Sequence, residues 1–266
     1  MVSHFPVSAL KATHRHSPGL ALAALTLFVL LLAPSARPAL AEPLPGLTYL
    51  TEEYYPFNYT ENGDLKGVSY ELLRMVWEEL GMPPKPVEVL PWARGYERVR
   101  FEKGTVLFSM ARTPERERLF HWVGPIMAVR FVLIARKDRA IRLDSLDDLR
   151  GMTVGTLRGD VSDTLLTAYQ TIASIQPVAD MRQNIDKLMN NRLDMVAYEE
   201  LSWDKIAARS GLTVDDFETV YVLRETPVYF AFNKDVCEVV VKQFQEALDR
   251  ARKRSRFRQI LDDYLN

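Results

Sequence analysis

Residues 150–169 read RGMTVGTLRGDVSDTLLTAY, and this stretch decides the fold. The apolar run Met152–Thr156 predicts a strand, and after a glycine turn the segment Val161–Tyr169 predicts a helix. The same order occurs earlier in the chain, where a strand over Leu47–Thr51 precedes a helix over Val68–Leu80. A strand and helix pattern that restarts in this way indicates two α/β units in one chain.

Further elements surround these two units. The other predicted strands are Val87–Leu90, Thr105–Met110, Val129–Ala135, Asp194–Tyr198 and Val228–Phe232. The other predicted helices are Trp92–Glu102, Ile185–Asn190, one beginning near Ser202, Val236–Arg252 and Phe257–Leu265. Because the second set lies inside the first, we predict a two-lobed α/β fold, each lobe a sheet flanked by helices, joined by two crossing strands. Lobe 1 is expected over 42–129 with 228–266 and lobe 2 over 130–227, with a ligand site between them.

Residues 1–41 have the pattern of a secretory signal peptide. Lys11 and Arg15 precede an apolar run of 15 residues, Gly19–Ala33, and Ala39–Ala41 supplies the small-x-small end. The alternative is a transmembrane anchor, but the run is shorter than the roughly 20 residues that span a bilayer. We therefore expect export of the chain and cleavage after Ala41.

Charge and composition argue against several classes of protein. Beyond the predicted leader the chain holds 31 basic and 35 acidic residues, a net charge of −4, which does not favour nucleic acid as a partner. His121 and Cys237 are the only histidine and cysteine there, so neither a His/Cys zinc site nor an intrachain disulfide is expected. The patterns of serine hydrolases, phosphate loops and dinucleotide sites are also missing from the sequence. We expect a monomer without metal or cofactor.

The segment Ser109–Arg116 (SMARTPER) contains the first candidate site. Arg112 and Arg116 follow a predicted strand, and a guanidinium there can bind a carboxylate or phosphate through paired hydrogen bonds. The alternative is that both arginines lie on the surface and pair with Glu115 and Glu117. The residues alone leave these two interpretations open.

A second candidate is the predicted helix start in Thr156–Ser162 (TLRGDVS). Free N–H groups at a helix start can bind an anion. Asp160 is a good N-cap, however, and would occupy these donors itself. A simple capped helix is therefore the favoured interpretation.

Acidic and aromatic side chains complete the candidates. Glu199 and Glu200 end an alternating strand, where an acid either binds a cationic group or is solvated. Tyr54 and Trp92 follow predicted strands and are placed to stack on a planar or cationic ligand. Phe57 is expected in the core, and Trp92 fits either environment.

A series of short segments, taken in order, carries a resemblance to a known family. The segments are Tyr54-Tyr55-Pro56-Phe57, Gly67 with Leu80-Gly81, Thr113-Pro114-Glu115-Arg116, Phe120 with Gly124-Pro125, Leu146 and Leu149-Arg150-Gly151 with Val154-Gly155, and Arg192-Leu193-Asp194. This series resembles the family 3 periplasmic solute-binding proteins, the polar amino acid receptors of ABC importers. The resemblance spans essentially all of the chain after the leader. It implies a periplasmic binding protein-like fold, a periplasmic location, capture of a small polar ligand by hinge closure, and an ABC permease as partner.

The resemblance also implies roles for single residues. Arg116 matches the arginine that binds the ligand α-carboxylate, with Ser109 and Ala111 beside it. The remaining matches are Tyr54 as the aromatic that covers the ligand, Asp160 and Val161 at the helix start that helps to bind the carboxylate, and Glu199 as the acid that pairs with the α-amine. The segment Pro91-Trp92-Ala93-Arg94 resembles one branch of the family and adds Trp92 and Arg112 to the predicted ligand site.

Several positions depart from the family pattern, and two of these departures bear directly on the ligand. Asp160 stands where the family often has Thr or Ser, and an acid there should repel a carboxylate. Glu199 stands where Asp is usual. The alternatives to a transport receptor are a periplasmic enzyme on the same fold, similar to cyclohexadienyl dehydratase with Glu199 as general acid, and a soluble sensory binding module.

Overall fold

The computed structural model describes residues 1–2, 4 and 46–265. The predicted apolar leader segment and the cleavage point after Ala41 lie outside the described residues. In the part that is described, no helix has the length and apolar character needed to cross a bilayer.

Residues 46–265 form an eight-stranded sheet and a separate two-stranded hairpin. The strands are β1 Thr48–Thr51, β2 Tyr59–Glu61, β3 Asp64–Lys66, β4 Val87–Val89, β5 Thr105–Ala111, β6 Phe120–Arg136, β7 Thr153–Leu157, β8 Ser174–Val178, β9 Met195–Glu199 and β10 Phe217–Asn233. The helices are α2 Val68–Glu79, α3 Trp92–Phe101, α4 Val161–Leu166, α5 Arg182–Met189, α6 Glu200–Arg209, α7 Glu238–Lys253 and α8 Ser255–Leu265. Short 3₁₀ helices are η1 Glu117–Leu119, η2 Lys137–Arg139, η3 Leu146–Leu149, η4 Thr167–Tyr169 and η5 Val214–Asp216.

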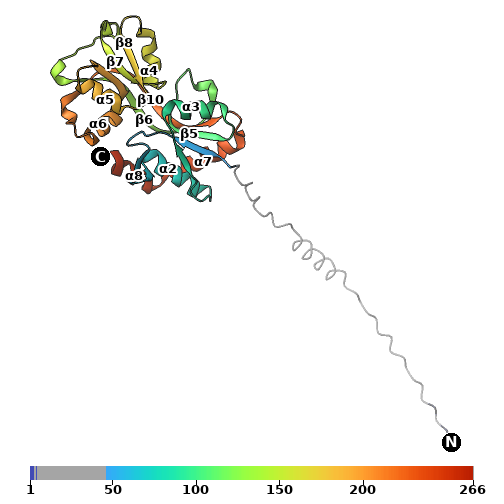
Figure 1. Ribbon diagram of the computed structural model, residues 1–266. Coiled ribbons are helices and arrows are strands. Elements are labelled where there is room, and N and C mark those ends of the chain that lie inside the picture. The colour runs from blue at the N-terminus through green and yellow to red at the C-terminus, as the bar shows by residue number, and fades with distance from the viewer. Residues whose placement is uncertain (3, 5–45, 266) are drawn as a thin grey trace. The chain divides into compact units, whose positions relative to one another are not determined.

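The large sheet has the order β4-β1-β5-β10-β6-β9-β7-β8. β1 pairs in parallel with β4 and β5, and β7 pairs in parallel with β8 and β9, so each end of the sheet is a parallel trio. We call the trio β4-β1-β5 with α2, α3, α7 and α8 the first lobe, and the trio β9-β7-β8 with α4, α5 and α6 the second lobe. Figure 1 shows these two groups on either side of β6 and β10.

β6 and β10 connect the lobes as a long antiparallel pair of 17 residues each. Their pairing register shifts three times, between Thr219 and Tyr221, between Val222 and Arg224, and between Val228 and Phe230. Irregularities of this kind bend a strand locally. The predicted crossings at residues 129/130 and 227/228 fall within these two strands, while the lobe boundaries themselves stay a prediction.

The parallel trios place their carboxyl ends where a site is expected. β1 ends directly before Glu52, β5 ends at Ala111, β7 ends at Leu157 and β9 ends at Glu199. The segments that follow these strands carry the candidate residues from both lobes. The two-lobed sheet predicted from the repeated pattern is therefore present, with its strand ends directed to the site.

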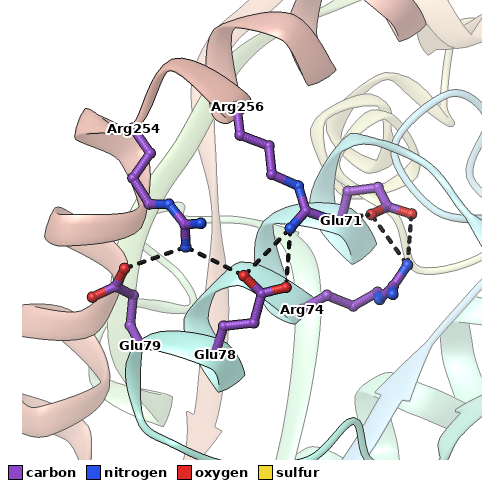
Figure 2. A network of polar contacts seen from close by, with 6 residues as sticks. All are labelled: Glu71, Arg74, Glu78, Glu79, Arg254 and Arg256. Carbon is purple, nitrogen blue, oxygen red and sulfur yellow. Dashed lines mark hydrogen bonds and ion pairs between the residues drawn. The ribbon is translucent and has the colours of Figure 1, made fainter.

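Helices α7 and α8 return to the first lobe and pack beside α2. Figure 2 shows the ion pairs of this contact: Arg254 Nη1 lies 3.2 Å from Glu78 Oε2, and Arg256 Nη1 lies 3.0 Å from Glu78 Oε1. Glu79 pairs with Arg254 at 3.4 Å and with Arg250 at 3.0 Å. These pairs place cations beside the C-terminal end of α2, where the acidic side chains alone would oppose the helix dipole.

Candidate functional site

Arg116 lies between the two lobes. The residue is buried, with an exposure of 6%. Nη2 donates to the backbone oxygen of Gly159 in the second lobe at 3.2 Å, and Nη1 donates to the backbone oxygen of Ala111 at 3.4 Å. Burial lowers the pKa of Arg116 from its usual value. A guanidinium in this position is only partly paired, which is the condition for binding an anion.

Two aromatic rings hold this guanidinium in place. Arg116 Cζ lies 5.0 Å from the ring centroid of Trp92 and 5.1 Å from that of Tyr96, distances of a cation–π contact. Trp92 Nε1 itself donates to Gly159 O at 2.8 Å. Both rings come from α3, which begins at Trp92 directly after Pro91. The structure thus supports a place for Trp92 at the contact between the lobes.

The gap between the lobes contains two cavities that share Arg116, Trp92 and Val161. The central cavity, of about 20 Å³, is lined by Glu52, Tyr54, Trp92, Ser109, Ala111, Arg116, Phe131, Leu157, Asp160, Val161 and Tyr198. The larger cavity, of about 290 Å³, is lined by Trp92, Ala93, Tyr96, Thr113, Glu115, Arg116, Gly159, Val161, Thr164, Leu165 and Arg224. The central cavity holds about one water molecule. The lobes are therefore close together in this structure.

Asp160 stands directly before helix α4 and caps it. Its Oδ1 accepts from the backbone N–H of Asp163 at 2.7 Å, as the sequence predicted for a capped helix. Its Oδ2 is buried and has no hydrogen-bond partner among the described residues. Burial raises the pKa of Asp160 to about 7, and the neighbouring Arg116 opposes this rise. Asp160 thus brings an acceptor without a partner to the lining of the central cavity.

Glu52 is the acidic residue that sequence reasoning missed. It follows β1 in the first lobe and lines the central cavity opposite Asp160. Burial raises the pKa of Glu52 to about 8; the charge of Asp160 adds to the rise and that of Arg116 opposes it. The Glu52-Glu53 pair resembles an ordinary solvated strand end, so only a prediction of which residues face the other lobe could have found it.

A buried polar network fixes the loop that carries Glu52. Asn58 Nδ2 donates to the backbone oxygen of Glu52 at 2.8 Å, and the hydroxyl of Ser109 donates to Asn58 Oδ1. The hydroxyls of Ser109 and Ser69 are also hydrogen-bonded, at 2.8 Å. Ser109 adopts a left-handed conformation with φ of 62°, which is unusual for a residue other than glycine and is held here by this network. Ser109 therefore positions the loop as well as lining the cavity.

Tyr54, Ala111 and Val161, three of the predicted ligand-binding residues, also line the central cavity. The hydroxyl of Tyr54 is buried and has no hydrogen-bond partner within residues 46–265. The ring centroid of Tyr54 lies 6.2 Å from that of Tyr198 in the second lobe. Phe57 is fully buried, which confirms its assignment to the core.

Glu199 does not line either cavity. Its Oε2 accepts from Ser202 N at 2.7 Å and its Oε1 accepts from Leu201 N at 3.2 Å, so the carboxylate caps helix α6. Its exposure is 2%, and burial raises its pKa. A solvated strand end is therefore the wrong interpretation. Each oxygen accepts one backbone N–H, and the predicted pairing of Glu199 with a ligand amine stays a prediction.

Arg112 is also absent from both cavities. Its Nη2 lies 2.6 Å from Glu117 Oε1, and its guanidinium packs over the rings of Trp122 and Tyr229. This is the surface pairing that the sequence offered as the alternative for both arginines. The structure realises it for Arg112 and not for Arg116, because Arg116 follows the tight turn at Thr113 and faces the second lobe. The described residues contain no group of three or more His, Cys, Asp or Glu side chains placed to hold a metal ion.

Comparison with protein families decides the family. The model for bacterial extracellular solute-binding proteins, family 3, matches residues 47–266. The chain belongs to this family. The resemblance seen in the sequence is thereby confirmed, and with it the periplasmic binding protein-like fold.

Individual relatives agree with this assignment. The chain is 28% identical over 250 residues to the L-arginine-binding protein of Pseudomonas aeruginosa, covering 86% of this chain and 91% of that one. It is 24% identical over 229 residues to the probable amino-acid-binding protein YxeM of Bacillus subtilis, covering 81% and 82%.

Solved structures show the same fold at lower identity. An ancestral arginine-binding protein bound to arginine superposes with a TM-score of 0.72 at 19% identity, covering 84% of this chain and all of that one. An ancestral amino acid-binding protein that is a precursor of cyclohexadienyl dehydratase gives 0.66 at 20% identity, covering 83% and 96%. At these identities the likeness concerns the fold alone.

Proposed function

We propose that this protein captures a small polar ligand with an amino group, an amino acid or a related compound, in the gap between its lobes. Capture takes place in the periplasm, and the closed protein delivers the ligand to an ABC importer. Membership of the solute-binding family supports this role, as do relatives that are amino-acid-binding proteins.

The observation that carries the proposal is the position of Arg116. This guanidinium is buried between the lobes, and Arg116 lines both cavities. A ligand carboxylate that binds it replaces the weak contact to Gly159 O with a charge-assisted pair. Closure around the ligand excludes water and strengthens the ion contact, because the local dielectric falls.

Substitution of Arg116 tests the proposal. In Arg116→Ala we expect the affinity for an amino acid ligand, found by a thermal-shift screen of amino acids, polyamines and small organic acids, to fall by roughly tenfold or more. Arg116→Lys keeps the charge but loses the planar fork and should restore only part of the affinity. Arg118→Ala is the matched control, since Arg118 is exposed two residues away. Equal affinity of all four proteins in isothermal titration calorimetry would contradict the proposal.

The enzymatic alternative requires a general acid in the gap. Glu199 was the candidate, but its two oxygens accept hydrogen bonds from the backbone of α6 and it lies outside both cavities. Incubation with prephenate and arogenate, followed by product analysis, tests this alternative directly. A soluble sensory role uses the same binding event, so uptake of the labelled ligand by a strain lacking the gene separates transport from sensing.

A further inference from the structure

A cationic group of the ligand needs hydrogen-bond acceptors in the gap between the lobes. An ammonium or guanidinium group only donates hydrogen bonds, so it needs acceptor oxygens, and a carboxylate is the strongest of these. Glu199, the acid at the expected position, accepts from the N–H groups of Leu201 and Ser202 and lines neither cavity. The candidate acceptors for a ligand cation are therefore the acidic side chains that do line the central cavity.

Two other acidic side chains line that cavity, one from each lobe. Glu52 follows β1 in the first lobe, and Asp160 stands directly before α4 in the second lobe. Asp160 is 7% exposed, and its Oδ2 has no partner among the described residues. Tyr54 is 5% exposed, and its hydroxyl is equally unpartnered in this part of the chain. Buried polar atoms are rarely left unpaired in native proteins, so atoms of this kind beside one cavity indicate a polar group that binds there.

The charges around the cavity do not balance. Two carboxylates face one guanidinium, that of Arg116, so the lining has a net charge of −1 when all three groups are ionised. Each carboxylate disfavours ionisation of the other: burial and the charge of Asp160 raise the pKa of Glu52. An unpaired charge in a buried site is costly, and a cation placed between the two carboxylates removes that cost.

The walls of the cavity also suit a cation. The rings of Tyr54 and Tyr198, from opposite lobes, are 6.2 Å apart, and Phe131 completes this side of the lining. Aromatic faces attract ammonium and guanidinium groups while they exclude water. The arrangement thus combines acceptor oxygens from both lobes with aromatic cover.

We propose that Glu52 and Asp160 together bind the cationic group of the ligand, one carboxylate from each lobe, and that the preferred ligand carries a net positive charge. This inference rests on the proposed function and names the class of its ligand. With the ligand carboxylate on Arg116, the two acids accept the amino group and a second cationic group, as in a basic amino acid. Because the two acids belong to different lobes, the cation also connects the lobes in the closed form.

The test compares ligands of similar shape that differ in charge. L-arginine and L-lysine, with agmatine and putrescine as cations without a carboxylate, are titrated against wild-type protein beside the neutral-side-chain compounds L-citrulline and L-norleucine. We expect wild-type protein to prefer the cationic member of each amino acid pair by roughly tenfold or more, the size of a charged hydrogen bond.

Variants then assign this preference to the two carboxylates. Glu52→Gln and Asp160→Asn should each reduce the affinity for L-arginine by roughly tenfold while changing that for L-citrulline little. Asparagine is itself a good N-cap, so Asp160→Asn preserves the start of α4. Glu53→Gln is the matched control: Glu53 is exposed, and its side chain accepts from Thr60 N through an oxygen that glutamine retains.

A second readout separates binding from a merely structural effect. If a cation pairs with carboxylates that are partly protonated in the free protein, binding releases protons. Titration calorimetry in buffers of different ionisation enthalpy should therefore show proton release for wild-type protein with L-arginine, and less of it for Glu52→Gln and Asp160→Asn.

The outcomes distinguish this inference from the proposed function. If wild-type protein binds L-citrulline or L-norleucine as tightly as their cationic partners, or if both variants keep the wild-type preference, the inference is overturned while ligand capture stands. If Arg116→Ala leaves every affinity unchanged, or no compound of the amino acid, polyamine or organic acid classes binds at all, the proposed function fails and this inference with it.

Discussion

At the scale of single residues, the backbone oxygen of Gly159 connects the lobes. It accepts hydrogen bonds from Trp92 Nε1 at 2.8 Å and from Arg116 Nη2 at 3.2 Å. Gly159 has a φ of 71°, a conformation that glycine adopts readily, and its N–H donates to Asp163 Oδ2 at 2.8 Å. The carbonyl is therefore held in a fixed direction, and it satisfies donors that a ligand oxygen can take over when it binds Arg116.

The acidity of the central cavity predicts a pH-dependent stability of the ligand-free protein. The pKa values of Glu52 and Asp160, about 8 and about 7, lie above those of an unfolded chain, near 4. Between about pH 4 and about pH 8, the folded protein therefore binds more protons than the unfolded chain. Its free energy of unfolding should fall as the pH rises, and the loss is complete above about pH 8. Other charged or titratable groups also act on this pair, namely Arg116, Glu53, Asp163, Tyr54 and Tyr198.

Thermal unfolding at about pH 5.5 and about pH 8.5 measures this effect. Glu52→Gln should raise the melting temperature at the higher pH by about 2–4 °C for each kcal/mol relieved. At the lower pH, where Glu52 is protonated in the folded protein, we expect little change. Glu97→Gln, at an exposed residue of α3 that is not among these groups, should keep the wild-type pH profile, and an identical profile for Glu52→Gln would contradict the prediction.

The contrast between Arg116 and Glu52 shows what the sequence could predict about the site. Arg116 stands in a recognisable segment after an apolar strand, and a guanidinium there already indicates anion binding. Glu52 stands in an acidic pair that is typical of solvated strand ends, and its burial depends on the approach of the second lobe. The sequence could not predict that Glu199 caps α6, because its partners, the N–H groups of that helix, depend on where the helix begins.

At the scale of elements, strands with unusual composition escaped prediction. The hairpin β2–β3 turns at Asn62-Gly63, both with positive φ, which is a known hairpin signal, yet its strands of three residues show no alternation to detect. β8 contains Pro177, which is tolerated because β8 is an edge strand. β6 and β10 were predicted only over Val129–Ala135 and Val228–Phe232, where the residues are mostly apolar. The rest of each strand mixes exposed with buried positions, so it shows no apolar run that would indicate a strand.

The contact of α2 with α7 and α8 gives a prediction at the same scale. Glu79→Gln removes two ion pairs near the C-terminal end of α2, one with Arg254 (Figure 2) and one with Arg250. Partly exposed pairs of this kind contribute at most about 1 kcal/mol, so we expect the melting temperature to fall by about 2–4 °C or less. The difference from wild-type protein should shrink in high salt, because salt screens exposed charges.

Glu97→Gln on α3 is the control for this substitution. Glu97 is exposed and forms no ion pair within residues 46–265. Its loss should leave the melting temperature nearly unchanged at either salt concentration. A decrease for Glu79→Gln that persists undiminished in high salt would show that packing, and not charge, holds the helices together.

At the scale of the whole lobed body, residues 46–265, the contacts between lobes favour closure. Besides the hydrogen bonds to Gly159, the rings of Tyr54 and Tyr198 approach each other across the central cavity. That cavity, of about 20 Å³, is smaller than an amino acid, so the lobes must separate before a ligand can enter it. The register shifts in β10 lie in the strand pair that joins the lobes, where a change of backbone angles can produce this opening.

Arg209 tests how the lobes are held together at a distance from the cavities. Its Cζ lies 4.9 Å from the ring of Tyr55 and 5.4 Å from that of Tyr59, so a residue of α6 in the second lobe packs on the first lobe. Arg209→Ala removes a cation–π contact of about 0.5–1 kcal/mol and should weaken ligand affinity by roughly two- to fivefold. The cause is a shift of the free protein toward the open form, since Arg209 does not line either cavity.

Small-angle scattering without ligand should accordingly give a larger radius of gyration for Arg209→Ala, whereas the ligand-saturated proteins should agree. Arg209→Lys keeps the charge but stacks less well, so it should lie between the two. A radius and an affinity that do not change in Arg209→Ala would mean that this contact follows closure and does not promote it.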